Sequence, residues 1–141
     1  MKVFLDTSVL VPVFYGDHPH HAASLAVFTR FGKAEASCGA HSLAEVYSTL
    51  TRMPGKFRVG GDQVMLFIEN IRERLTVVSL SADEYAETLQ HFADLGIVGG
   101  AIYDALLAGC ALKVKAETLF TWNIRHYGQF GADITPRLRT P

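Results

Sequence analysis

The chain has 141 residues, of which 49% are hydrophobic and 19% are charged, and its formal net charge at pH 7 is −1. This length predicts a single domain over residues 1–141, and the composition excludes disordered, collagen-like and coiled-coil chains. The longest segment without Asp, Glu, Lys or Arg covers residues 18–29, which is too short to span a bilayer. Two cysteines make no disulfide framework, and Asp6 interrupts the first apolar run, so we expect a cytoplasmic protein without a membrane segment or signal peptide.

The first part of the chain predicts two strands around a pair of helices. An apolar run at residues 3–5 is typical of a buried strand, and a short helix is expected within residues 8–15. A second helix is predicted from about residue 17 to 30, followed by a weak strand at 35–39. The residues of that helix expected to point inward are Ala22, Leu25, Ala26 and Phe28.

The middle of the chain predicts two further helices and the clearest strand. Ser42 with Glu45 three residues later has the spacing of a capping box, which predicts a helix that ends at Pro54. Another helix is expected after residue 61, and the β-branched run at 76–80 predicts a strand.

The last part of the chain continues the alternation. Ser81 and Glu84 form a second capping box, opening a helix that ends near residue 96. A helix over 101–113, a strand over 118–121 and a last strand over 133–135 are predicted. This order implies an α/β fold with a central, mostly parallel sheet covered on both faces. Sites in such folds lie beyond the carboxyl ends of strands.

Asp104 is the only charged residue between 101 and 112. Its neighbours at helical spacing are Ala101, Ala108 and Ala111, so its carboxylate is expected to be partly buried. Burying a carboxylate without a partner costs several kcal/mol. Two interpretations remain open: a structural pair with an arginine or backbone N–H groups, or a ligand of a bound cation.

Asp6 and Glu45 add two acids whose roles are ambiguous when each is taken alone. Asp6 follows the first strand and could instead cap the helix after it. Glu45 could instead be a solvent-exposed residue or a member of the capping box. Three carboxylates brought together would repel one another unless a cation neutralised them. Oxygen ligands suit Mg²⁺ or Mn²⁺, which activate water for phosphodiester hydrolysis.

Four segments in chain order resemble the motifs of PIN-domain ribonucleases, most closely the VapC toxins of toxin–antitoxin pairs. They are Val-Phe-Leu-Asp-Thr-Ser at 3–8, Ser-Leu-Ala-Glu-Val at 42–46, Ile-Tyr-Asp-Ala-Leu-Leu-Ala at 102–108 and Leu-Phe-Thr-Trp-Asn-Ile-Arg-His-Tyr at 119–127. The resemblance implies a three-layer α/β/α fold and Mg²⁺-dependent RNA cleavage. It also implies a homodimer and neutralisation by a small antitoxin.

The same resemblance assigns site residues. It implies that Asp6, Glu45 and Asp104 hold the metal and that Asn123 assists, where many family members carry an acid. Asparagine keeps an oxygen but loses a charge, which weakens a second metal site; its alternative role is a helix cap. Ser8 and Thr121 are expected to orient the acids through hydrogen bonds.

Basic and histidine residues complete the candidates. Arg52, Lys56, Arg58 and Arg125 follow elements that carry site residues, so they are candidates for RNA contacts or, alternatively, antitoxin contacts. The histidines at 18–21 are expected at the surface start of a helix rather than in a zinc site. His126 is open to a substrate contact or a structural hydrogen bond.

Six other aromatic and Met side chains have two possible locations. They are predicted in the core or in a groove for an antitoxin helix. These residues are Phe14, Phe28, Phe57, Phe67, Met53 and Met65.

Two other classes of function compete with the nuclease. One is a phosphoryl-accepting signalling domain, which needs an acidic pair near the amino terminus and a lysine after a late strand. The other is a non-catalytic interaction module that keeps the fold.

Overall fold

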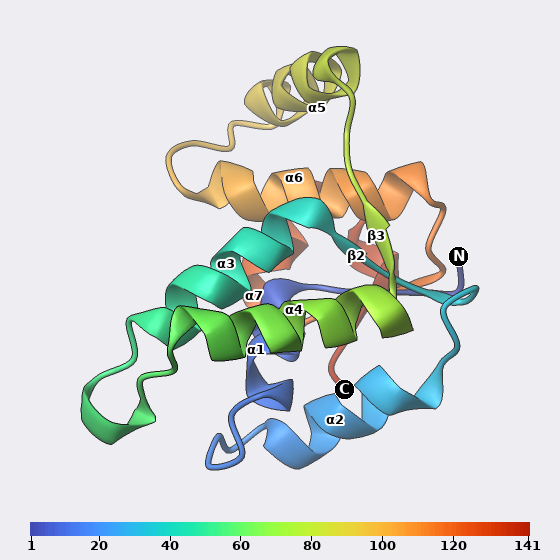
Figure 1. Cartoon of the computed structure of the whole chain (residues 1–141). Coiled ribbons are helices and arrows are strands. Elements are labelled where there is room, and N and C mark those ends of the chain that lie inside the picture. Colours follow the sequence, from blue (N-terminus) through green and yellow to red (C-terminus); the bar gives the residue numbers. More distant parts are fainter.

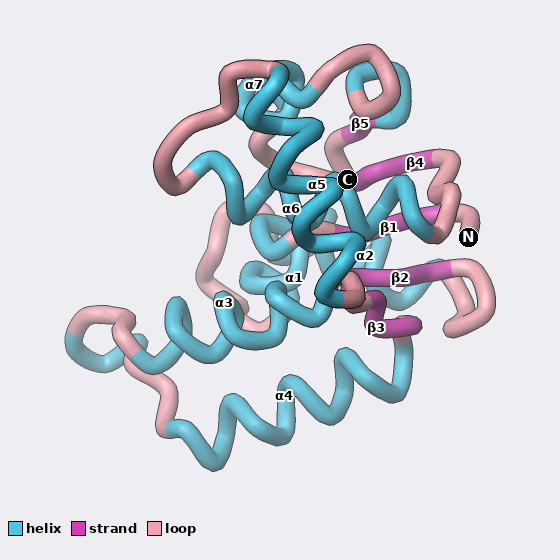
Figure 2. Tube along the Cα trace, turned by 90° about the horizontal axis from the view of Figure 1, so that it is seen from above, coloured by secondary structure: helices cyan, strands magenta, loops and turns pink.

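The computed structural model describes residues 1–141 and contains a five-stranded sheet in which every paired strand is parallel, in the order β3-β2-β1-β4-β5. Figure 2 shows the five strands side by side in this order. The strands are β1 (Val3–Leu5), β2 (Ala36–Gly39), β3 (Thr76–Val78), β4 (Thr118–Phe120) and β5 (Leu138–Arg139). The helices are α1 (Thr7–Val13), α2 (His21–Arg30), α3 (Ala40–Thr51), α4 (Gly61–Arg74), α5 (Ala82–Asp94), α6 (Ala101–Lys113) and α7 (Ile124–Tyr127).

Helices cover both faces of the sheet, as expected for parallel strands joined by crossovers. In Figure 1, α6 lies over one face and α5 lies on the outer side of α6, while α1, α2 and α4 lie toward the other face. The structure is therefore a three-layer α/β/α sandwich, which confirms the predicted fold class. None of its helices combines the length and the apolar character needed to cross a membrane.

Alternation along β1 divides the interior into two cores. Val3 and Leu5 belong to the core shared with α1, α2, α3 and α4, whereas Phe4 belongs to the core formed with α5, α6 and α7. Successive side chains of a strand point to opposite faces, so a fully buried strand is apolar at every position. All three residues are at most 2% exposed, which places the end of β1 at the centre of the molecule.

Three local predictions were wrong. Helix α3 begins at Ala40, with Gly39 at its N-cap position, so Ser42 lies inside the helix and forms no capping box. The predicted strand at 133–135 is a turn leading into a short 3₁₀ helix, Thr135–Arg137, and the last strand follows it. Of the residues expected to face inward on α2, only Phe28 is buried.

Gly39 lets β2 and α6 approach closely. A Cβ atom at this position would lie 2.5 Å from Leu107 Cδ2 and 3.6 Å from Phe4 Cζ. Leu107 and Phe4 are both fully buried, so neither can move aside into solvent. The absence of a side chain at Gly39 therefore sets the separation between the sheet and α6.

We expect Gly39→Ala to destabilise the protein by about 1–3 kcal/mol, because it overpacks a closed core. Urea or thermal unfolding measures the loss. Gly32→Ala is the matched control, since a Cβ there would meet nothing within 4 Å and its φ is not positive. Equal stabilities for the two variants would contradict this account of the contact between β2 and α6.

Candidate active site

Asp6 lies directly after β1, at the N-cap of α1, and is 1% exposed. Its Oδ1 accepts hydrogen bonds from Ser8 Oγ at 2.6 Å and from the backbone N–H of Val9 at 3.3 Å. Its Oδ2 accepts a hydrogen bond from Thr121 Oγ1 at 2.9 Å. Asp6 therefore caps α1, as one interpretation of the sequence predicted, and both of its carboxylate oxygens accept hydrogen bonds.

The same two hydroxyls connect Asp6 to the segment after β4. The backbone N–H of Trp122 donates to Ser8 Oγ, and that of Asn123 donates to Thr121 Oγ1, both at 2.9 Å. Ser8 and Thr121 thus bridge two chain segments that are more than a hundred residues apart. These bonds hold the segment carrying Asn123 beside Asp6.

Glu45 projects from α3 toward the same region. Its Oε1 accepts a hydrogen bond from Thr7 Oγ1 at 2.9 Å and lies 4.0 Å from His41 Nε2. The Thr7 hydroxyl also lies 2.9 Å from that of Ser42, which is fully buried. Ser42 therefore anchors the Thr7 hydroxyl, which contacts Glu45, instead of capping the helix.

Asp104 lies in the first turn of α6, and its side chain is 25% exposed. Its Oδ2 is 3.1 Å from Nε2 of His126, on α7. The partner is thus neither an arginine nor a backbone N–H, and His126 makes a structural contact with an acid. Spacing alone could not reveal this pair, because α6 and α7 meet only through the tertiary fold.

Burial and mutual repulsion change the acid strengths at this site. Burial, with a smaller contribution from the charge of Asp104, raises the pKa of Asp6 to about 7, against the hydrogen bonds from Ser8 and Thr121. Burial also raises the pKa of Asp104; His126 opposes this effect, and the charge of Glu45 adds to it. Burial and repulsion between the acids therefore outweigh the hydrogen bonds to Asp6 and the nearby histidines at Asp104.

A neighbouring buried tyrosine is affected by the same charges. Burial, then the charges of Asp6 and Asp104, raise the pKa of Tyr127 well above its usual value. Its buried hydroxyl is close enough to Asp6 for that carboxylate to contribute to the raised pKa, but it makes no hydrogen bond of ordinary geometry. Tyr127 therefore adds a neutral group, and no positive charge, to the surroundings of the acids.

One open cavity of about 520 Å³ brings the four predicted site residues together. Several other lining residues were not predicted from the sequence, among them Thr7, Thr49 and Trp122. Thr7 and Trp122 are next to predicted site residues in the sequence, so their adjacency could have identified them as lining residues. The lining residues are Asp6, Thr7, Ser8, Val11, Pro12, His18, His20, Glu45, Thr49, Asp104, Trp122 and Asn123.

The four basic candidates separate into two groups. Arg125 lines an adjoining hollow of about 500 Å³ together with Trp122, Asn123, His126 and Gln129. Arg52, Lys56 and Arg58 are exposed on the connection between α3 and α4 and line neither hollow. Only Arg125 is therefore adjacent to the acidic cavity.

Asp6, Glu45, Asp104 and Asn123 offer the cavity oxygen atoms of carboxylates and of one amide, which are the ligands that Mg²⁺ and Mn²⁺ prefer. Nowhere in the chain do three His, Cys, Asp or Glu side chains approach closely enough to form a complete metal site. Mg²⁺ commonly binds one or two carboxylates and keeps several waters, so a complete set of protein ligands is not required. The donor set therefore fits such an ion.

Asn123 occupies the N-cap position of α7, but its side chain makes no capping hydrogen bond. The residue is exposed and lines both hollows. The amide oxygen therefore remains free for a ligand, although the position in the chain is that of a cap.

The chain is similar to known proteins over most of its length. The PIN domain family model matches residues 3–127. Ribonuclease VapC27 of Mycobacterium tuberculosis is 38% identical over 114 residues, which are 80% of this chain and 79% of VapC27. Ribonuclease VapC40 of the same species is 33% identical over 120 residues, 85% of each chain.

Solved structures show the same fold at low sequence identity. The sarcin–ricin loop cleaving toxin VapC20 of M. tuberculosis superposes with a TM-score of 0.72 at 13% identity, covering 94% of this chain and 98% of VapC20. A chain of Rickettsia felis VapBC2, bound to a promoter DNA fragment, gives a TM-score of 0.66 at 20% identity. The superposition covers 99% of this chain and 98% of the VapBC2 chain. The family-model match and the relatives VapC27 and VapC40 confirm the resemblance seen in the sequence: the chain belongs to the PIN domain family.

Proposed function

We propose that this chain is a metal-dependent endoribonuclease and the toxin of a type II toxin–antitoxin pair. The observation that carries the proposal is the convergence of Asp6, Glu45, Asp104 and Asn123, from four separate parts of the chain, on one cavity. The relatives named as ribonucleases support the same activity. Lysine is absent from the cavity lining, which argues against a phosphoryl-accepting domain.

Asp6, Glu45 and Asp104 are the residues that would hold Mg²⁺ or Mn²⁺, with the Asn123 amide oxygen assisting. When bound, such an ion supplies an activated water and stabilises the leaving oxygen of the phosphodiester. Ser8, Thr121 and Thr7 orient the carboxylates by hydrogen bonds.

The RNA ends follow from the groups that take part. No histidine or lysine base is required, and the ribose 2′-hydroxyl need not take part in the reaction. The products therefore carry 5′-phosphate and 3′-hydroxyl ends.

In this proposal Arg125 contacts an RNA phosphate beside the cleaved one, and the support is that its hollow adjoins the acidic cavity. We keep Arg52, Lys56 and Arg58 as candidates for RNA or antitoxin contacts at the end of α3. The similarity to a chain of the R. felis VapBC2 complex supports a small antitoxin as partner. A homodimer in the cytoplasm completes the proposal.

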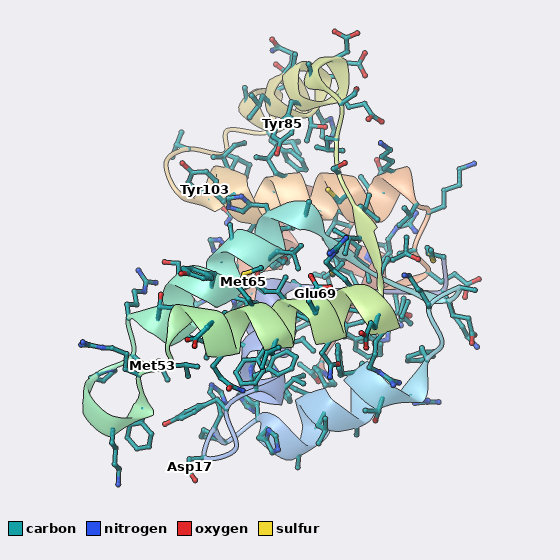
Figure 3. The ribbon with its side chains drawn as sticks, in the orientation of Figure 1. Asp17, Met53, Met65, Glu69, Tyr85 and Tyr103 are labelled. Atoms are coloured by element: carbon teal, nitrogen blue, oxygen red, sulfur yellow. The ribbon has the colours of Figure 1, made fainter.

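The aromatic and Met candidates for an antitoxin groove divide by burial. Phe28 is buried, and Phe14 stacks on Phe67 with ring centroids 4.7 Å apart against the same core. Met65 on α4 is 47% exposed, and Figure 3 shows it there, with Met53 at the connection before α4. The exposed Met65 is the better candidate for contact with an antitoxin helix.

Asp104→Asn should lower RNA cleavage by at least about a hundredfold while leaving the fold intact, because it keeps the shape and removes a ligand charge. Cleavage of a mixed RNA pool with Mg²⁺ measures the effect, and circular dichroism checks the fold. Asp94→Asn, an exposed acid on α5, is the control and should cleave normally. A wild-type rate for Asp104→Asn would make Asp104 purely structural, and an inactive wild type would favour the non-catalytic module.

Mg²⁺ should raise the melting temperature of the wild type, relative to EDTA, by roughly 2–8 °C. The reason is that a cation favours the ionised form of the buried Asp6 and relieves its repulsion with Asp104. The difference should shrink in Asp6→Asn and persist in Asp94→Asn. Equal differences in all three proteins would remove the case for a shared ion site.

Asn123→Asp should raise the affinity for Mn²⁺ roughly tenfold, because it adds an anionic oxygen with little change of shape. Stability without metal should fall, since the new charge repels the other acids. Isothermal titration measures the affinity, and Asn123→Ala should reduce cleavage far less than Asp104→Asn does. An affinity unchanged in Asn123→Asp would show that this side chain points away from the ion.

A further inference from the structure

One side of the acidic cavity is aromatic, and the cleavage chemistry proposed above does not use it. The rings of His20 and Trp122 stack with centroids 3.6 Å apart and planes inclined by 8°. His18 lies next to them, its ring centroid 5.5 Å from that of His20. All three residues line the cavity that holds the acids. We call these three rings the aromatic wall.

Hydrogen bonds hold the aromatic wall in place. The Trp122 Nε1–H donates to Oγ of the fully buried Ser24 at 2.9 Å, and the indole packs against the core beneath α1 and α2. The backbone N–H of His20 donates to His18 Nδ1 at 3.0 Å, which orders the loop before α2. The indole is thus a rigid support for the imidazole stacked on it.

The aromatic wall is also tied to the acids. The Ser8 hydroxyl that accepts the Trp122 backbone N–H is the one that donates to Asp6 Oδ1. A group resting on the wall is therefore held at a set position relative to the carboxylate. Trp122 also lines the hollow that contains Arg125, so a chain leaving the acids along this side passes the indole.

A flat, partly exposed ring surface in an otherwise polar cavity suits a planar ligand group. Neither lysine nor arginine lines this cavity, so the aromatic wall offers no fixed cation to a phosphate. Nucleobases, in contrast, stack on Trp and His side chains whenever they are not stacked on their neighbours in the strand. The ring geometry thus favours a base over the sugar–phosphate backbone.

We propose that His20 and Trp122 form a stacking platform for a nucleobase next to the cleaved phosphate, and so determine which nucleotide the enzyme accepts there. The base continues the stack on the face of the imidazole turned away from the indole. This proposal rests on RNA as the substrate. It predicts that the RNA is cut where a base is free to leave its stack, in a single-stranded segment.

The single tryptophan of the chain makes the platform directly observable, because all indole fluorescence comes from Trp122. Titration with a single-stranded oligoribonucleotide, without divalent ions so that it is not cut, should change this fluorescence. An abasic ribose-phosphate chain of equal length should change it far less. His20→Ala should weaken the binding of the base-containing strand roughly 10- to 100-fold, and His20→Phe should restore it. His91→Ala is the control, since His91 is exposed on α5, and it should bind like the wild type.

Cleavage with Mg²⁺ gives a second, independent measure. Each oligoribonucleotide in a set carries one abasic residue, and its position differs from one oligoribonucleotide to the next. The wild-type cleavage rate should fall when the abasic residue occupies one particular position beside the cut. His20→Ala should cut the intact strand slowly and be insensitive to the abasic residue at that position. A stack with a merely structural role would instead lower the rates for all substrates equally.

The outcomes separate this proposal from the proposed nuclease activity. Cleavage without a fluorescence change, and with equal rates across the abasic set, overturns the platform and leaves the nuclease standing. A base-dependent fluorescence change without cleavage supports the platform and overturns the nuclease. The absence of both overturns both.

Discussion

The carboxylate of Asp6, buried where β1 ends, is the constraint on which the rest of the site depends. A carboxylate removed from water costs several kcal/mol unless other groups compensate. Here the compensation is hydrogen bonds from Ser8, Thr121 and the Val9 N–H, and it is incomplete, because burial still raises the pKa to about 7. An uncompensated charge in a polar cavity favours a cation beside it.

The register between β1 and β4 brings Thr121 to the carboxylate of Asp6. Parallel pairing places Leu5 opposite Phe120, so the next residues along the two strands, Asp6 and Thr121, are adjacent. The Asp6 N–H donates to the carbonyl of Phe120 at 3.1 Å, extending the ladder by one residue. A shift of register would separate the hydroxyl from the carboxylate, so the buried charge and the pairing of β1 with β4 depend on each other.

Helix packing then brings the other acids to the end of β1. Helix α3 follows β2 directly and carries Glu45, and the close approach allowed at Gly39 seats α6, which carries Asp104. Histidines on α3 and α7 lie near these two acids, at 4.0 Å from Glu45 and 3.1 Å from Asp104. The hydroxyl that orients Asp6 also positions Trp122, so the acids and the aromatic wall share one support.

The sequence alone determined the α/β class, the bounds of α6 and the capping box of α5, because these depend on local periodicity and on contacts three or four residues apart. It also singled out Asp104, since a lone charge on an apolar helix is visible without a structure. Tertiary structure alone decided that Ser42 supports Thr7, that His126 pairs with Asp104 and that His20 stacks on Trp122. Each of these contacts joins residues from different elements, and no local pattern encodes which elements will meet. The path of the chain around the sheet decides that.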